Sequence, residues 1–259
     1  MVIQQQKQLK VLVIGDSCKD IYHYGKCERI SPEAPVLILK ETRMETKPGM
    51  SANVVANLKA FEISVLHITN KEIIKKHRFV DEKFNQHVLR VDEGEYSDFC
   101  SIEIDKIRSI NETLDAVVIS DYDKGFLSYS NCDQITKYFE NTPVFVDSKK
   151  NDLSCYKNSI VKINEKEYEN LVYLPKNSEL IITMGSKGAF CNDKLYKTEK
   201  VNVFDVCGAG DVFLSGLVYC YTLTKNLPES IYFANKCAAY SVTKFGTYSL
   251  TRKDIKKII

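Results

Sequence analysis

The sequence predicts an α/β protein in which helices cover both faces of a mostly parallel central sheet. Six apolar runs of strand length indicate strands that are buried on both faces, as parallel strands usually are. These runs lie at 11–16, 63–68, 115–120, 143–148, 159–164 and 179–185. Candidate helices alternate with them, at about 51–61, 129–140, 165–171, 209–224 and 228–244. This alternation is typical of a parallel sheet between two layers of helices.

Polar residues stand at or next to the ends of four of these runs. They are Asp16, Asp121, Asp147 and Asn164. The carboxyl ends of parallel strands meet at one edge of a sheet, and ligands bind in the crevice outside that edge. We therefore expect a ligand site there, with these side chains pointing into it.

Two stretches do not continue the alternation of strand and helix. Residues 20–41 and 78–95 have the pattern of half-exposed strands separated by turn residues, which indicates antiparallel ribbons. The 259 residues contain no apparent linker or repeat. We predict a single domain, 1–259, in which the two ribbons form a small lid over the crevice.

Composition and charge argue against several classes of protein. The 36 basic and 34 acidic side chains are mixed along the chain, which gives no footprint for nucleic acid or an anionic membrane. No apolar stretch approaches the roughly eighteen residues of a membrane span, and the N-terminus lacks the apolar core of a signal peptide. The nine cysteines are odd in number, include no CxxC pair and do not cluster with the four histidines. We expect a cytoplasmic protein with reduced thiols and neither a zinc site nor a disulfide framework.

The segment DVCGAGDVF, residues 205–213, is the most informative part of the chain. Gly208 and Gly210 match the start of a dinucleotide-binding G-x-G-x-x-G motif, but Phe213 stands where the third glycine belongs. A second interpretation is structural: a glycine turn before a buried helix, with Asp211 near the positive end of the helix dipole.

A third interpretation of this segment is a site of phosphoryl transfer. The glycines would expose backbone N–H groups at a helix N-terminus, which together bind an anion. The neighbouring carboxylate of Asp211 would remove a proton from a hydroxyl that attacks the γ-phosphate. The residues of the segment alone do not decide between this interpretation and the structural one.

The segment resembles the second signature, D-T-x-G-A-G-D, of the ribokinase-like (PfkB) sugar kinases. The resemblance extends to KPGMSANVVANLKAF (47–61), INEKE (163–167), TMGSKGAF (183–190) and ANKCAAYSVTKFGT (234–247). Within the family, RISPEAPV (29–36), HVLRVDEGE (87–95), ISDYDKGFLS (119–128) and VFVDSKK (144–150) are most similar to bacterial D-glycero-D-manno-heptose 7-phosphate kinases. The resemblance implies a three-layer α/β/α fold with a β-lid and transfer of the γ-phosphoryl group of ATP to a sugar.

The resemblance also implies roles for the matching residues. Asp211 would be the catalytic base, and the amides of Gly208, Ala209 and Gly210 would hold the charge of the phosphoryl group in transfer. Glu167, with Asn164, would organise Mg²⁺ through water. The remaining implied contacts are Asp20, Gly49 and Asn53 with the sugar, Thr183, Gly185 and Gly188 with the nucleotide phosphates and ribose, Asn235 with the adenine, and Asp205 with a potassium ion.

Simpler interpretations of some of these residues remain open. Asn164 and Glu167 would also suit a helix-capping pair, and Asp20 an exposed turn. The basic side chains that could hold a phosphate on the sugar, or merely be solvated, are Arg29, Lys76, Arg78, Arg90 and Lys149.

The chain departs from the family pattern at three places. Met50 replaces the second glycine of a usual P-G-G, and Val206 and Cys207 replace the usual Thr-x after Asp205. Near residue 70, a G-D-D-x-x-G segment, a helix and a strand are missing. Two alternatives therefore remain: a kinase for another sugar or a nucleoside, and a non-catalytic nucleotide-binding relative. Because lids in this family often pair, we also expect a homodimer formed through the lid.

Overall fold

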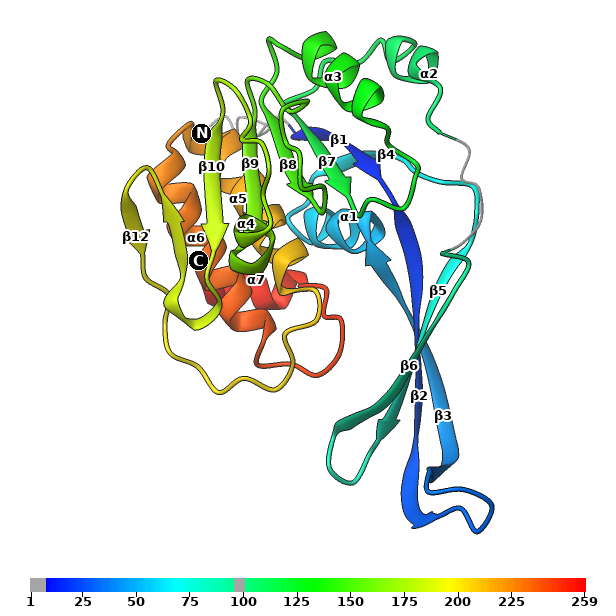
Figure 1. Ribbon diagram of the computed structural model, residues 1–259. Helices are drawn as coiled ribbons and strands as arrows, with labels where there is room; N and C mark the ends of the chain where they lie inside the picture. The colour runs from blue at the N-terminus through cyan, green and yellow to red at the C-terminus, as the bar shows by residue number, and fades with distance from the viewer. Residues whose placement is uncertain (1–7, 96–100) are drawn as a thin grey trace.

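The computed structural model describes residues 8–95 and 101–259, and a sheet of eight strands forms its centre (Figure 1). The strand order is β12-β11-β10-β9-β8-β7-β1-β4. Six strands run parallel: β1 (Lys10–Gly15), β4 (Ser64–Ile68), β7 (Ala116–Asp121), β8 (Val144–Ser148), β9 (Ile160–Asn164) and β10 (Glu179–Thr183). The short strands β11 (Ala189–Cys191) and β12 (Lys194–Tyr196) add an antiparallel edge. Each of the six predicted strands is present, within two residues of its predicted bounds.

Helices cover both faces of this sheet. One layer contains α1 (Ser51–Ala60), α5 (Ala209–Thr224), α6 (Leu227–Ser241) and α7 (Arg252–Ile258), and the other contains α2 (Ile104–Arg108) and α3 (Tyr129–Tyr138). Successive residues of β1 point to opposite faces, so Val11 and Val13 pack in the first layer while Leu12 and Ile14 pack in the second. The predicted α/β fold with a mostly parallel sheet is confirmed.

A second sheet of four strands extends from this body as a long, twisted ribbon (Figure 1). We call it the ribbon sheet; its strands are β2 (Ser17–Ile30), β3 (Leu37–Met50), β5 (Ile74–Asp81) and β6 (Gln86–Glu93). The pairs β2–β3 and β5–β6 are antiparallel, and β2 pairs with β5 in parallel. The two predicted ribbon segments therefore lie in one sheet, which begins closer to the body than expected because β2 and β3 continue to Ser17 and Met50.

The shortened region near residue 70 is a direct link between the two sheets. β4 ends at Ile68 and β5 begins at Ile74. The buried Asn70 side chain accepts a hydrogen bond from Ser17 N at 2.7 Å and donates to Ser17 O at 3.2 Å. Thr69 Oγ1 donates to Gly15 O at 2.8 Å. These bonds attach the link to the end of β1 and the start of β2, which fixes the base of the ribbon sheet.

Several short elements were not predicted: α2, α7, β11, β12 and the 3₁₀ turn η1 (Gly185–Lys187). With three to seven residues each, they are too short to carry a clear hydrophobic period. No helix in the described ranges has both the length and the apolar character of a membrane span.

Candidate active site

A cavity of about 770 Å³ opens where β8, β9 and β10 end and α5 begins. Tyr122 and Phe213 line it together with charged groups from the ends of β8 and β9. Nine of the predicted site residues also line it, namely Asn164, Thr183, Gly185, Gly188, Gly208, Ala209, Gly210, Asp211 and Asn235. The fold thus brings the segment 205–213 beside the segments predicted to hold a nucleotide.

The start of α5 has the features of an anion-binding helix N-terminus. Gly208, its N-cap residue, has φ +78°, and a Cβ there would lie 2.8 Å from Asn53 Nδ2. A Cβ at Gly210 would lie 2.8 Å from Lys162 Nζ, so the ammonium group approaches the backbone closely there. Ala209 N–H donates to Val206 O at 3.2 Å, and the N–H groups of Gly210 and Asp211 have no acceptor within the helix. Backbone N–H groups and the buried ammonium group of Lys162 therefore lie together at one end of the cavity.

Asp211 is buried, with 3 % of its surface exposed, and two donors hold its carboxylate. Tyr122 Oη donates to Oδ1 at 2.8 Å, and Asn53 Nδ2 donates to Oδ2 at 2.8 Å. Burial raises the pKa of Asp211 to about 6, while these hydrogen bonds and the nearby Lys162 oppose the rise. An aspartate with this pKa is mostly ionised at neutral pH and can accept a proton.

The three residues predicted to hold the sugar lie beside Asp211 rather than in the cavity lining. Asn53 contacts Asp211 directly, as described above, and Asn53 Oδ1 accepts from Ser249 Oγ at 2.8 Å. Asp20 is buried, which excludes the exposed-turn alternative. A Cβ at Gly49 would lie 2.6 Å from Asp20 Oδ2, so Gly49 and Asp20 touch one another.

Asp20 of β2 forms a buried ion pair within the ribbon sheet and a hydrogen bond that joins the sheet to the body. Arg78 of β5 donates to Asp20 Oδ1 from Nε at 3.1 Å and from Nη2 at 3.0 Å. Thr247 Oγ1 donates to Asp20 Oδ2 at 3.0 Å. Lys76, two residues away on the same strand, lies 5.9 Å from the centre of the Tyr122 ring. Of the basic residues considered from the sequence, Arg78 and Lys76 therefore contact Asp20 and Tyr122, Lys149 lines the cavity with Asp211, and Arg29 and Arg90 are exposed.

Asn164 and Glu167 form the capping pair that the sequence left as an alternative. Asn164 Oδ1 accepts from Glu167 N at 2.8 Å, and Glu167 Oε2 accepts from Asn164 N at 2.8 Å, at the start of α4 (Glu165–Glu169). Lys149 Nζ pairs with the other Glu167 oxygen. Asn164 faces the cavity as predicted, and Glu167 lies behind it.

Asp147 lines the cavity between two lysines. Lys162 Nζ donates to Asp147 Oδ2 at 2.7 Å, and Lys149 Nζ lies 3.6 Å from Oδ1. Burial raises the pKa of Asp147, but the two ammonium groups outweigh this and hold it below its usual value. Asp147 Oδ1 has no hydrogen-bond partner in the described part of the chain. An ionised carboxylate with an oxygen that accepts no hydrogen bond is a ligand that suits Mg²⁺, so Asp147 and the neighbouring Asn164 fit a magnesium site, with Glu167 behind them as the residue that orients Asn164.

Asp205 lies beside the cavity, and its carboxylate is surrounded by N–H groups. Cys207 N donates to Oδ1 at 2.9 Å, and Gly246 N donates to Oδ2 at 3.0 Å. His87 Nε2 lies 3.3 Å from Oδ2. Burial raises the pKa of Asp205, but these contacts outweigh it and hold the pKa well below its usual range. Nitrogen and sulfur groups do not fit potassium, which prefers a shell of oxygen ligands, and we assign Asp205 no step through that ion.

The site contains residues that the sequence analysis did not assign. Lys162 is a charged residue in a strand buried on both faces, and that mismatch was the available signal. The hydroxyl of Tyr122 had no comparable signal. Asp121 does not point into the cavity as predicted, because its carboxylate accepts from the buried Lys150 Nζ at 2.7 Å. Asp16 Oδ2 instead accepts from Tyr122 N at 2.9 Å, so it supports the segment that carries this tyrosine.

Curated proteins of similar sequence include two of the same name. The bifunctional protein HldE of a Nitratiruptor species is 32% identical over an alignment of 299 positions, which covers 96% of this chain and 64% of that protein. The bifunctional protein HldE of Campylobacter jejuni (strain RM1221) is 32% identical over an alignment of 302 positions, which covers 98% of this chain and 65% of that protein. The chain therefore spans about two thirds of the length of these relatives.

Solved structures of similar fold include two sugar kinases. Ribokinase from Thermotoga maritima matches with a TM-score of 0.68 and 18% identity, over 96% of this chain and 99% of that one. Phosphofructokinase-2 from Escherichia coli in complex with potassium matches with a TM-score of 0.75 and 16% identity, over 97% of each chain. These likenesses confirm the predicted ribokinase-like fold.

Residues 60–254 match the sequence profile described as pfkB family carbohydrate kinase. This match covers most of the chain and includes every segment that lines the cavity. The predicted enzyme class, a sugar kinase, is confirmed at this level: the chain belongs to the pfkB family of carbohydrate kinases.

Proposed function

We propose that this chain transfers the γ-phosphoryl group of ATP to O1 of D-glycero-D-manno-heptose 7-phosphate, giving the 1,7-bisphosphate for heptose incorporation into lipopolysaccharide or another surface polysaccharide. The observation that carries the proposal is the meeting of Asp211, the glycine-rich start of α5 and the predicted nucleotide residues in one cavity. The resemblance of segments 29–36, 87–95, 119–128 and 144–150 to heptose 7-phosphate kinases favours this acceptor. The supply of ATP suits a cytoplasmic reaction.

Asp211 acts as the base in this proposal. Its carboxylate takes the proton of the acceptor hydroxyl as the sugar oxygen bonds to the γ-phosphorus and the bond to ADP breaks. Tyr122 and Asn53 fix the carboxylate, and each oxygen still has a lone pair for the sugar. An anomeric hydroxyl is more acidic than an ordinary alcohol, so a carboxylate is a sufficient base for it.

The start of α5 and Lys162 stabilise the charge of the group in transfer. The N–H groups of Gly210 and Asp211 and the ammonium group of Lys162 lie at the same end of the cavity. Fixed donors of this kind act on developing charge without reorganising, which lowers the barrier to transfer. Asp147 and Asn164, with Glu167 behind them, would hold Mg²⁺ through water. Mg²⁺, when bound, neutralises charge on the ATP phosphates.

Lys76 of the ribbon sheet and Lys124 of the loop after β7 supply the groups for the acceptor's own phosphate. Lys76 Nζ lies 3.6 Å from Glu95 Oε1, and Lys124 Nζ lies 2.8 Å from Glu95 Oε2. A carboxylate held between two ammonium groups marks a place that suits an anion. A phosphate on the sugar would compete with Glu95 for these lysines, and a non-phosphorylated sugar would not.

A panel of acceptors tests the proposal. ADP release is measured with heptose 7-phosphate, the free heptose, fructose 6-phosphate and ribose, with Asp211→Asn as the inactive control. Heptose 7-phosphate should give the highest kcat/KM, and Lys76→Met should raise KM for that acceptor but not for the free heptose. Turnover of ribose alone would instead assign another sugar. ATP binding without turnover of any acceptor would favour the non-catalytic alternative.

We further propose that the ribbon sheet serves as the lid of a single kinase domain and pairs with a second copy of the chain. Exposed apolar side chains on its strands support this, namely Ile30, Leu37, Met44, Leu89 and Val91. Such strands are protected when another sheet covers them. Sedimentation at micromolar concentration should give a dimer, and a single monomeric species would contradict the pairing.

A further inference from the structure

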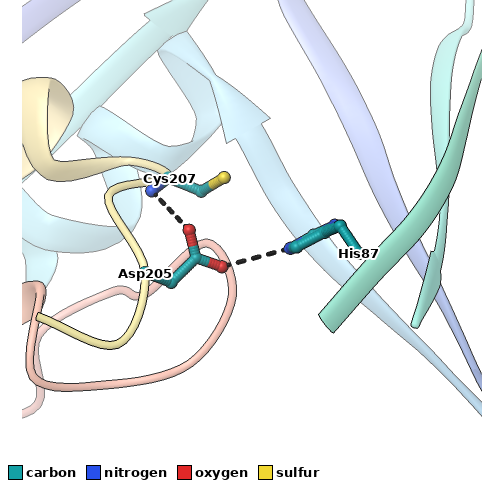
Figure 2. A group of neighbouring side chains, drawn as sticks. All are labelled: His87, Asp205 and Cys207. Atoms are coloured by element: carbon teal, nitrogen blue, oxygen red, sulfur yellow. Dashed lines mark hydrogen bonds and ion pairs between the residues drawn. The ribbon is translucent and has the colours of Figure 1, made fainter. Parts of the chain in front are cut away.

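Three side chains with metal-binding atoms meet beside the cavity, although they come from distant parts of the sequence. His87 lies on β6, and Asp205 and Cys207 lie in the loop that leads into α5. One ligand atom from each lies within 4.8 Å of the other two. Figure 2 shows the Asp205 carboxylate between the His87 ring and the Cys207 backbone. The spacing of histidines and cysteines along the sequence does not indicate this cluster, because His87 comes close to Cys207 only when β6 packs against the loop.

The separations suit a tetrahedral metal ion. Zinc lies about 2.0–2.1 Å from histidine nitrogen and carboxylate oxygen and about 2.3 Å from cysteine sulfur. Tetrahedral angles then place nitrogen and oxygen about 3.4 Å apart, and sulfur about 3.6 Å from either. His87 Nε2 and Asp205 Oδ2 are 3.3 Å apart. Because one ligand atom of each residue lies within 4.8 Å of the other two, the Cys207 sulfur would need to move by on the order of 1 Å to complete this geometry.

Neighbouring groups already orient two of the three ligands. The Asp205 carboxylate accepts from Cys207 N at 2.9 Å and from Gly246 N at 3.0 Å, and these bonds leave room for a further ligand on each oxygen. The His87 ring stacks on Phe245 with centroids 5.7 Å apart. Outer contacts of this kind hold metal ligands in place. The His87 side chain is 34% exposed, so an ion can enter from solvent.

We propose that His87, Asp205 and Cys207 form a three-ligand site for a divalent transition metal ion, with Zn²⁺ as the ion of choice. One nitrogen, one oxygen and one sulfur ligand select such an ion over Mg²⁺ or K⁺, which prefer oxygen alone. The fourth position is open to water. The site does not depend on which sugar the enzyme accepts.

A metal ion at this site ties the ribbon sheet to the loop before α5. His87 belongs to the ribbon sheet, and the other two ligands come one to three residues before Gly208. Metal binding therefore restrains β6 against the loop that leads into the anion-binding start of α5. The expected result is slower opening between the two parts.

Metal titration of the untagged, nucleotide-free protein tests the ligand set. Co²⁺ serves as the spectroscopic probe because a bound thiolate gives a sulfur-to-cobalt absorption band, and Zn²⁺ should displace the Co²⁺ at one equivalent. Cys207→Ser should abolish the band, and His87→Gln should weaken Co²⁺ binding at least tenfold. Cys27→Ser is the matched control, because Cys27 is a partly exposed thiol of β2 in the same sheet. This substitution should leave the cobalt band and the affinity for Co²⁺ unchanged.

Two outcomes would overturn the assignment. One is a cobalt band that survives Cys207→Ser. The other is Zn²⁺ binding that is lost in His77→Gln but kept in His87→Gln, because His77 forms a separate pair with His23. Hydrogen exchange gives a second measurement: Zn²⁺ should slow exchange at Gln86–Glu93 in the wild type and in Cys27→Ser, but not in Cys207→Ser. Equal exchange with and without Zn²⁺ in the wild type would refute the link between the two parts.

Discussion

Replacing Tyr122 by phenylalanine separates the role of its hydroxyl from the role of its ring. The hydroxyl donates one of the two hydrogen bonds that hold Asp211, at 2.8 Å, and this bond lowers the carboxylate pKa. A hydrogen bond to a charged group contributes about 1.5–3 kcal/mol, and about 1.4 kcal/mol corresponds to one pKa unit. The substitution should therefore raise the pKa of Asp211 from about 6 by about one to two units.

The consequence is a shift in the acidic limb of the pH profile. A base with a pKa of about 6 is about nine-tenths ionised at pH 7, whereas one with a pKa between about 7 and 8 is between half and one-tenth ionised. At pH 7, kcat/KM of Tyr122→Phe should therefore fall about two- to tenfold, and it should recover by about pH 9.

ADP release between pH 5 and 9 measures this limb. Tyr219→Phe is the control, because this tyrosine stacks on Phe61 away from the cavity, and its limb should not move. The reasoning is refuted if Tyr122→Phe loses the same factor at every pH, since the hydroxyl would then act by position alone.

Three further predictions concern stability and charge in the same region. Burial raises the folded-state pKa of Asp211 to about 6, so its ionised form destabilises the fold above that pH. The penalty fades as pH falls from about 6 to the ordinary aspartate pKa of about 4. In urea unfolding, Asp211→Asn should therefore gain stability over wild type at pH 8, keep about half of that gain at pH 5 and lose most of it by about pH 4. Met50 has φ 56° and is buried, so Met50→Gly should be more stable than Met50→Ala by about 1 kcal/mol, the reverse of the usual order, and equal unfolding midpoints would show that the backbone there is unstrained. Lys162→Met should lower kcat about 10²-fold because it removes the cation beside Gly210, and a loss of less than threefold would exclude the assigned role.

The sequence predicted the parts of the site that depend on local pattern. Strand ends carry such a pattern, and it was enough to place Asn164 at the cavity that it lines. The glycines before α5 raised the phosphoryl-transfer interpretation of Asp211, but the resemblance to sugar kinases was needed to prefer it and to assign Thr183. Contacts across the chain have no local pattern. The bond from Tyr122 to Asp211 joins residues 89 apart, and the contact between His87 and Asp205 joins residues 118 apart. Both depend on how the ribbon sheet and the strand ends pack, which the residue types did not reveal.

Met50 shows how the shortened segment is connected to Asp211, the proposed base. Its side chain packs with Cys18 and Ile74 at the base of the ribbon sheet, and Tyr122 packs against this cluster. Ile74 is the first residue of β5 after the short link, so Met50 fills space beside the place where the chain lacks a longer segment. A glycine at position 50 would relax the backbone but leave Tyr122 less supported. Met50→Gly should therefore lower kcat/KM while it restores backbone freedom, because the side chain that strains the chain also holds the tyrosine that orients Asp211.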